Sequence, residues 1–338
     1  MDQEPLAIGG YLPLSKVYSF IPVPENLNTE AAKHILGGQA NLWTEYVSDL
    51  EHAQYMTFPL IAAMSEALWS PKEERIWEDF SRRIQLFMKR YDQMGINYSK
   101  SAYQVSAKAQ IDTEKKQLAV SLKSELADVE IHYTTDGIEP TNLSPVYSES
   151  ILLDKTTTIK AITLAQGMPS EKILSLSFNI NKATVKPIKY LVPFSEYYKG
   201  PGEYSLVNGI RGTTNHRDGE WQGWVSTNME VVIDLQETIE IRNISVGSLQ
   251  NDGVLIFFPK KVEIFVSAEG TNFKKVGETL NDTDLLSGEK QLKDFKVSFD
   301  PVSAHFVKVV ASNLGKVPKG YASEGKAAWL FVDEISVE

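Results

Sequence analysis

Residues 35–46 read Ile-Leu-Gly-Gly-Gln-Ala-Asn-Leu-Trp-Thr-Glu-Tyr. The apolar residues between Ile35 and Trp43 predict a buried strand, and its glycines would let another backbone approach closely. Side chains two positions apart on a strand point the same way, so Trp43 and Glu45 would face a common space. The stretch therefore predicts one strand of an α/β architecture, with an aromatic ring and a carboxylate together at its end.

The residues after this stretch have the periodicity of helices. Ser48 and Asp49 can cap a helix, which Pro59 is expected to bend or break early. Pro71 is expected to begin the next helix, where apolar residues recur every three or four positions, and Gly95 to end it. Together with the strand, these segments make the N-terminal region α/β material.

The rest of the chain changes character from about Tyr98 onward. Short strands separated by turn signals predict a small antiparallel β-sandwich, with strands expected at 119–122, 129–133 and 158–163. After a linker at 182–187 the chain is again all-β and richer in aromatic residues, which suits a jelly-roll-like sandwich. Its strands are expected at 231–235, 239–246, 262–266 and 306–310.

Composition excludes several classes of function. The 338 residues carry 34 basic and 44 acidic side chains, a net charge of −10, which disfavours a nucleic-acid partner. Cysteine is absent, which excludes disulfides, thiolate metal sites and cysteine nucleophiles. No signal peptide is visible and the apolar runs are short, so we expect no membrane span. The length alone would also permit one complete (β/α)8 enzyme.

Four motifs can be compared with known families: LAIGGYLPL at 6–14, GGQANLWTEY at 37–46, Phe58-Pro59 and AMSEALWS at 63–70. Together they make residues 4–97 resemble the end of the catalytic domain in family 20 glycoside hydrolases, the β-N-acetylhexosaminidases. The resemblance implies that Trp43 stacks on the apolar face of a terminal N-acetylglucosamine. It implies that Glu45 accepts hydrogen bonds from the 4- and 6-hydroxyls of that sugar. The alternative is that Trp43 is a core aromatic and Glu45 a solvated rim residue.

The same resemblance implies substrate-assisted, retaining hydrolysis, in which the acetamido group of the substrate attacks its own anomeric carbon. In these enzymes an adjacent Asp-Glu pair on an earlier strand orients the acetamide and supplies the general acid. In this chain the Asp-Glu sequence occurs at Asp333-Glu334, in the final β-region and not on an earlier barrel strand. A barrel needs roughly 250 residues, more than the region before Tyr98 holds. We therefore expect a barrel truncated to its last βα unit, with no catalytic residue in the chain.

Motifs in the β-regions resemble two other domains. IHYTTDGIEPT at 131–141 resembles the C-terminal sandwich of chitobiases and hexosaminidases. LVNGIRG, WQGW and VDEI, which begin at 206, 221 and 332, resemble the discoidin, or coagulation factor 5/8 C-type, domain. The chain is thus expected to be multidomain, with a (β/α)8 remnant at 1–97, a small β-sandwich at 98–182 and a discoidin-like jelly roll at 183–338.

The discoidin resemblance implies sugar binding through loop residues at one end of the jelly roll. The candidates are His216, Arg217, Trp221, Trp224 and Phe257. The alternative is that the tryptophans belong to the core. Related domains often hold a structural calcium ion, expected here at Asn208 and Glu334, although Asn208 stands where aspartate is usual. No other cofactor is expected.

Two functions remain open from the sequence. The chain can be the C-terminal portion of a β-N-acetylhexosaminidase that removes terminal N-acetylhexosamine from glycans, inactive by itself. It can instead be a non-catalytic carbohydrate-binding protein that acts through the discoidin-like domain. In both cases the expected partners are N-acetylhexosamine-containing glycans, with self-association through the exposed barrel remnant. We expect the parent enzyme to be exported to a periplasm or cell surface.

Overall fold

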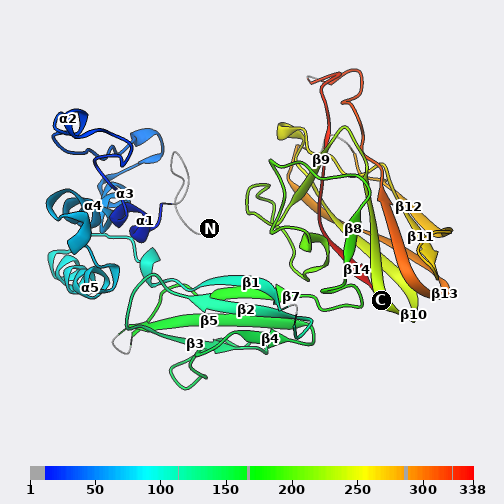
Figure 1. The fold of residues 1–338 in the computed structure, drawn as a ribbon, viewed down its shortest axis with the longest axis horizontal. Helices are drawn as coiled ribbons and strands as arrows, with labels where there is room; N and C mark the ends of the chain where they lie inside the picture. Colours follow the sequence, from blue (N-terminus) through cyan, green and yellow to red (C-terminus); the bar gives the residue numbers. More distant parts are fainter. Residues whose placement is uncertain (1–11, 113, 166–167, 285–287, 322) are drawn as a thin grey trace. The chain divides into compact units, whose positions relative to one another are not determined.

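The structure is a computed structural model that describes residues 12–112, 114–165, 168–284, 288–321 and 323–338 (Figure 1). It divides into two compact units. The first holds the described residues up to Lys108, together with Ser121–Glu149 and Ile159–Ser175; the second holds Ala109–Val120, Ser150–Thr158 and Leu176–Glu338. Each unit is described by itself.

The described part of the first unit begins with helices. Asp49 caps one of them by accepting the His52 N–H at 2.8 Å, and Pro59 separates that helix from the next, as the sequence predicted. Gly95, at a φ of 66°, ends the longest helix, as predicted. Pro71 precedes only a short 3-10 turn. The helices are α1 Leu14–Tyr18, α2 Thr29–Ala32, α3 Leu50–Thr57, α4 Leu60–Trp69 and α5 Trp77–Met94, with 3-10 turns η1 Thr44–Tyr46, η2 Lys72–Glu74 and η3 Ser101–Tyr103.

The strand predicted at 35–43 is wrong for this structure. These residues form neither a helix nor a strand, and Leu36 is 97% exposed. A strand is held by hydrogen bonds to a neighbour, and no strand among the described residues pairs with this segment. Among the described residues before Tyr98, the N-terminal region contains helices and 3-10 turns and no strand. The structure therefore does not show a βα unit there.

The helices are fixed to a turn of the first β-region, within the same unit. The Trp77 indole donates to the Glu125 carbonyl at 3.1 Å, and the Ser15 hydroxyl donates to the Glu125 carboxylate at 2.7 Å. The Ser81 hydroxyl accepts the Ala127 N–H at 2.6 Å. These bonds join α1 and α5 to the residues that precede the next strand. The buried side chains of the helical core are Leu14, Tyr18, Ala63, Phe80, Ile84, Met88 and Tyr91, with Tyr98, Ala102 and Leu126.

The first β-region forms two small sheets. One has the strand order β1-β2-β4, and the other has the order β3-β5-β6 with β7 also paired to β5. The predicted strands at 119–122, 129–133 and 158–163 overlap β2, β3 and β5, so they are confirmed. The strands are β1 Ser106–Asp112, β2 Gln117–Lys123, β3 Glu130–Thr134, β4 Ile151–Leu153, β5 Thr157–Ala165, β6 Met168–Pro169 and β7 Leu174–Phe178.

The C-terminal region forms one seven-stranded sheet with the order β12-β11-β13-β10-β14-β9, and β8 also pairs with β10. The predicted strands at 231–235 and 239–246 both lie on one long strand, β10, which bulges between them. Alternate residues of β10, such as Val231, Ile233 and Leu235, are fully buried, as a strand with one core face requires. The strands are β8 Ile188–Tyr190, β9 Gln222–Val225, β10 Met229–Gln250, β11 Lys261–Ser267, β12 Lys274–Leu280, β13 Gln291–Ala311 and β14 Trp329–Val337.

The segment expected to be a linker is tied to the last strand. The Asn181 side chain accepts the N–H groups of Ala183 and Val337, and the Lys182 N–H donates to the Val337 carbonyl at 3.0 Å. The Asn179 amide donates to the Ser336 hydroxyl at 3.1 Å. The start of the C-terminal domain is therefore fixed against β14.

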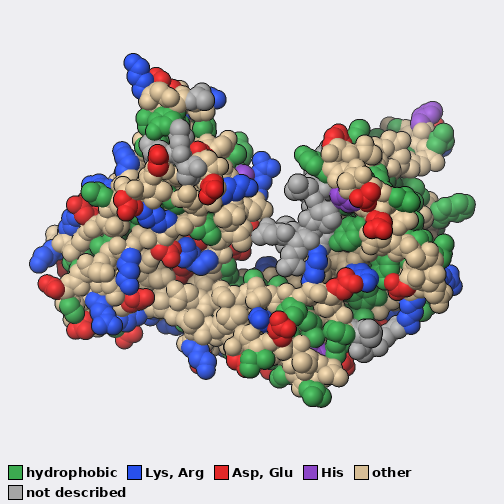
Figure 2. All heavy atoms as spheres, turned by 180° about the vertical axis from the view of Figure 1, so that it is seen from behind, with side chains coloured by type: hydrophobic (Ala, Val, Ile, Leu, Met, Phe, Trp, Pro, Cys, Tyr) green, Lys and Arg blue, Asp and Glu red, His purple; other side chains and the backbone are tan. Residues whose placement is uncertain are grey.

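Charged side chains of both signs are interspersed on the face that Figure 2 draws. No basic patch is visible on this face. Within the described ranges, no helix combines the length and the apolar character that crossing a membrane requires.

Candidate functional site

Trp43 and Glu45 lie at the 3-10 turn η1 in the first unit. Trp43 immediately precedes the turn and is 61% exposed, and Glu45 is exposed within the turn. Because no strand forms here, the shared strand face expected for the two side chains is not realised. Both side chains are accessible to a ligand, and the core position considered for Trp43 does not hold.

A groove of about 510 Å³ runs between α4 and α5 of the same unit. Its polar side is an ion pair, in which both Glu66 oxygens lie 2.7 Å from the Arg83 guanidinium and one also accepts the Tyr18 hydroxyl at 2.9 Å. Hydrogen bonding to Arg83 lowers the pKa of the Glu66 carboxyl. Its apolar rim includes Trp69, which is exposed. Since Glu66 is already paired, it is not a free acid.

Three of the predicted glycan contacts are in the core. Trp221, Trp224 and Phe257 are only 1–2% exposed. The Trp221 indole donates to the Thr213 carbonyl at 3.0 Å, and the Trp224 indole donates to the Val192 carbonyl at 3.2 Å. Their ring faces are covered by protein, so a sugar has no surface to stack on. The core alternative for the two tryptophans is the one that the structure supports.

His216 and Arg217 remain at the surface, on the loop 213–220. His216 is half-buried and Arg217 is exposed. The centroids of the Tyr198 and His216 rings lie 6.2 Å apart. The sequence alone does not reveal this neighbour, because Tyr198 lies 18 positions before His216. Burial, together with the charges of Arg217 and Lys290, holds the pKa of His216 below its usual 6.5. At neutral pH the site therefore presents a neutral imidazole beside a tyrosine and two cations.

Asp218 closes this loop. One of its carboxylate oxygens accepts both the N–H and the hydroxyl of Thr213, at 2.5 and 2.8 Å. The other oxygen accepts the Glu220 N–H at 3.0 Å. The two ends of the loop are thus held by one side chain, in the manner typical of aspartate in turns.

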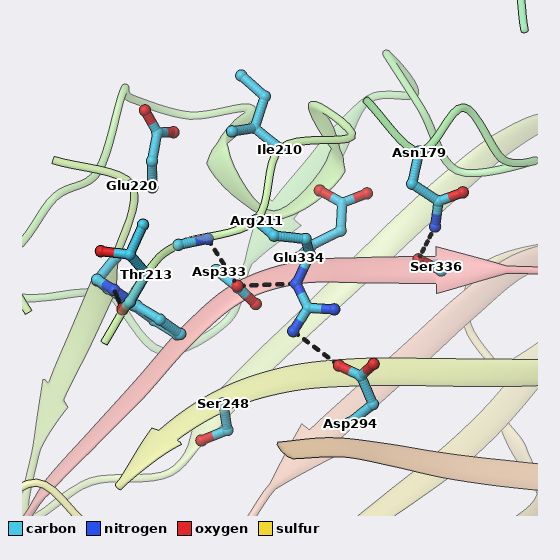
Figure 3. Close-up of polar contacts among 12 residues, drawn as sticks. Asn179, Ile210, Arg211, Thr213, Glu220, Ser248, Asp294, Asp333, Glu334 and Ser336 are labelled. Carbon is cyan, nitrogen blue, oxygen red and sulfur yellow. Dashed lines mark hydrogen bonds and ion pairs between the residues drawn. The ribbon is translucent and has the colours of Figure 1, made fainter. Parts of the chain in front are cut away.

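The base of the loop is anchored by an ion pair between Arg211 and the buried Asp333 (Figure 3). The Arg211 guanidinium lies 2.8 Å from Asp333 on β14 and 2.7 Å from Asp294 on β13. The same Asp333 oxygen accepts the Gly212 N–H at 2.9 Å. The other Asp333 oxygen is buried and has no hydrogen-bond partner in the described part of the chain. The pair fixes the residues that lead into the loop.

Glu220, at the end of the loop, is mostly buried and one of its oxygens has no partner among the residues that the structure describes. Burial raises the pKa of Glu220 to about 7, and the negative charges of Asp218 and Asp333 add to this. The carboxyl group therefore keeps its proton to a higher pH than an ordinary glutamate does.

Asn208 and Glu334, the predicted calcium ligands, both accept hydrogen bonds from N–H donors in this structure. The Asn208 side-chain oxygen accepts the Ile210 N–H at 2.8 Å. Both oxygens of the buried Glu334 face N–H donors, of Gly209 at 3.0 Å and of the Asn181 side chain at 3.3 Å. A bound cation would need these oxygens turned towards it. Nor do the described residues contain a cluster of three or more metal-ligating side chains.

The two carboxylates of the Asp333-Glu334 pair likewise accept hydrogen bonds from protein groups. Asp333 accepts a hydrogen bond from the Arg211 guanidinium (Figure 3), and Glu334 accepts the Gly209 N–H. Burial raises the pKa of both carboxyl groups above their usual values. Both side chains are fully buried in the C-terminal domain, so neither is accessible to a substrate.

Three family models match successive parts of the chain. Residues 1–72 match the glycosyl hydrolase family 20 catalytic domain, residues 112–175 match the chitobiase/beta-hexosaminidase C-terminal domain, and residues 193–328 match the F5/8 type C domain. The chain therefore carries a segment of a family 20 catalytic domain followed by these two domains.

Curated relatives carry hexosaminidase names. A beta-hexosaminidase of Porphyromonas gingivalis is 33% identical over 169 residues, which are 48% of this chain and 21% of that protein. A beta-hexosaminidase of Akkermansia muciniphila is 37% identical over 83 residues, which are 23% of this chain and 17% of that protein. The matched region thus spans about a fifth of the length of these relatives.

Solved structures resemble a part of the chain. The Clostridium perfringens module CpGH89CBM32-5, in complex with GalNAc-beta-1,3-galactose, is 20% identical over 45% of this chain and 93% of its own, with a TM-score of 0.29. A chitosan-binding module from Paenibacillus sp. IK-5, in complex with chitotriose, is 18% identical over 46% of this chain and 98% of its own, with a TM-score of 0.29.

Proposed function

We propose that this chain is the C-terminal part of a β-N-acetylhexosaminidase and does not hydrolyse glycosides by itself. The observation that carries the proposal is the order of the three family matches, which begin with a family 20 catalytic segment at residues 1–72. The 33% identity to a beta-hexosaminidase supports the same assignment. In this reading the parent enzyme removes terminal N-acetylhexosamine with retention of configuration.

The proposed inactivity of the chain alone is supported by the state of the acidic residues in its Asp-Glu pair and in the groove. A family 20 general acid must reach the glycosidic oxygen. Asp333 and Glu334 are buried in the last strand, and Glu66 is engaged by Arg83. An assay with a chromogenic β-N-acetylglucosaminide tests this: no turnover above buffer is expected, and turnover by the purified chain would contradict it.

Trp43 and Glu45 are proposed to be the contribution of this chain to the substrate site. Both are accessible, which a stacking ring and a hydroxyl-accepting carboxylate require. In the parent enzyme we expect Trp43→Ala to raise KM for a β-N-acetylglucosaminide more than it lowers kcat. An unchanged KM would contradict the role of the ring.

A second function, glycan binding by the C-terminal domain, is favoured by the surface around loop 213–220. There a neutral imidazole, an exposed guanidinium and the Tyr198 ring lie together. Sugars are bound by such combinations of an aromatic ring and planar hydrogen-bonding groups. Calorimetric titration with N,N′-diacetylchitobiose tests the proposal, and His216→Ala should weaken binding. His305→Ala, on β13 of the same domain, is the matched control.

A further inference from the structure

We propose that Asp218 is the positioning residue of this glycan site: its carboxylate holds loop 213–220 in the one conformation that presents His216 and Arg217. The inference deepens the second function proposed above and rests on it. Asp218 need not touch the ligand in this role, because it acts through the backbone of its own loop.

Asp218 closes loop 213–220 through hydrogen bonds to both of its ends. The Asp218 carboxylate receives three hydrogen bonds, two from Thr213 at the start of the loop and one from the Glu220 N–H at its end. His216 and Arg217 lie between those two points in the sequence. A single side chain therefore brings the two ends of the loop together.

A relay of hydrogen bonds runs from that closure to the tip of the loop. The Thr213 hydroxyl, which donates to Asp218, accepts the Asn215 N–H at 3.1 Å. The Asn215 side chain in turn accepts the Arg217 N–H at 3.1 Å. The position of the Arg217 backbone thus depends on Asp218 through two intermediate side chains.

The residues at both ends of the loop are themselves held in place by the core of the domain. The Trp221 indole donates to the Thr213 carbonyl, and a Cβ at Gly212 would lie 2.4 Å from the Trp221 ring. The Gly212 N–H is held by the buried Asp333. Both ends of the loop thus leave a rigid base, so the mobility that remains is that of the segment which Asp218 closes.

The consequence for binding is pre-organisation. A loop that is ordered before the ligand arrives does not lose conformational entropy on binding, whereas a loosened loop must be ordered by the ligand. Without the Asp218 carboxylate, we expect the dissociation constant for a glycan to rise about tenfold. The side chain of Asp218→Asn keeps one acceptor oxygen, so that variant should lie between wild type and Asp218→Ala.

The experiment combines two measurements on the full chain at pH 8, above the pKa of Glu220. Calorimetric titration with N,N′-diacetylchitobiose gives the affinity of wild type, Asp218→Ala and Asp218→Asn. Hydrogen exchange reports the amides of Thr213 and Glu220, which should exchange faster in Asp218→Ala. Glu269→Ala is the matched control, because Glu269 likewise accepts an N–H and a side-chain amide from Asn272 in a turn elsewhere in the domain.

The outcomes separate the two proposals. Weaker binding and faster exchange in Asp218→Ala, with Glu269→Ala binding like wild type, support the positioning role. If wild type binds and Asp218→Ala binds as tightly, or its loop amides exchange at the wild-type rate, only the positioning role is overturned. If wild type itself binds no chitobiose, the proposed binding function is contradicted, and the positioning role falls with it.

Discussion

The buried carboxylate of Asp333 lies 2.8 Å from the guanidinium of Arg211, a residue 122 positions earlier in the chain. This pair joins the last strand of the C-terminal sheet to the start of the loop that carries His216 and Arg217. Because the Asp333 side chain is fully buried, breaking the pair would leave a charge without compensation in the core. The loop and the core of the domain are therefore energetically linked.

Gly247 makes room for this pair, and its replacement should destabilise the domain. A Cβ at Gly247 would lie 2.1 Å from an Asp333 oxygen and 2.4 Å from the Arg211 guanidinium. We expect Gly247→Ala to lower the free energy of unfolding by about 2 kcal/mol, measured by urea denaturation. Gly253→Ala is the control, since its nearest contact is 3.6 Å away. Equal effects of the two substitutions would contradict this role of Gly247.

Glu220 should make stability depend on pH. Burial raises the pKa of Glu220 from an ordinary 4.5 to about 7, so the folded protein binds this proton more tightly than the unfolded chain. Its contribution to stability is therefore lost as pH rises from about 4.5 to 7. Glu220→Gln should reduce that decline, measured by urea midpoints at pH 5 and 7.5. Glu196→Gln, at an exposed position, should leave it unchanged; a decline of wild-type size in Glu220→Gln would contradict the burial of the charge.

Calcium should not stabilise the chain, because the oxygens of Asn208 and Glu334 already accept hydrogen bonds from nitrogen. Melting curves with 5 mM calcium, about a thousandfold above a typical sensor-site Kd, should coincide with curves in chelator. A calcium-dependent rise in Tm that disappears in Glu334→Gln would instead support the calcium site expected from the sequence.

The groove between α4 and α5 should cause self-association through a second copy of the chain. Trp69 on its rim is 89% exposed, and Ile61 and Phe87 beside it are also exposed. Apolar patches of this kind associate in water. Light scattering should show a mass that rises with concentration, and Trp69→Ser should reduce the rise. Tyr197→Ser, equally exposed in the other unit, is the control. A constant monomer mass for wild type would contradict this prediction.

Most of the β-architecture could be predicted because its signal is local. Consecutive residues determine the alternation of buried side chains along β10. They also determine the hairpin between β11 and β12. The strand expected at 35–43 could not be predicted in this way. Its apolar residues satisfy the same pattern, but a strand also needs a partner, and periodicity says nothing about whether one exists.

Only part of the candidate site could be predicted from the sequence, because local patterns indicate exposure but not long-range packing. His216 and Arg217 are polar residues among turn signals, so their exposure follows from local sequence. The burial of Trp221 depends on Gly212 and on strand β14, which lies about a hundred positions away. Likewise, the Arg211–Asp333 pair has no local signature. Long-range packing decides which aromatic rings are free to meet a ligand.

Together, the two proposed functions mean that this chain holds N-acetylhexosamine glycans without hydrolysing them. One NMR experiment tests it, in which the chain is incubated with N,N′-diacetylchitobiose and saturation transfer to the sugar and release of N-acetylglucosamine are followed in the same sample. We expect saturation transfer with no free N-acetylglucosamine over the time course. Release of the monosaccharide, or the absence of any saturation transfer, would contradict it.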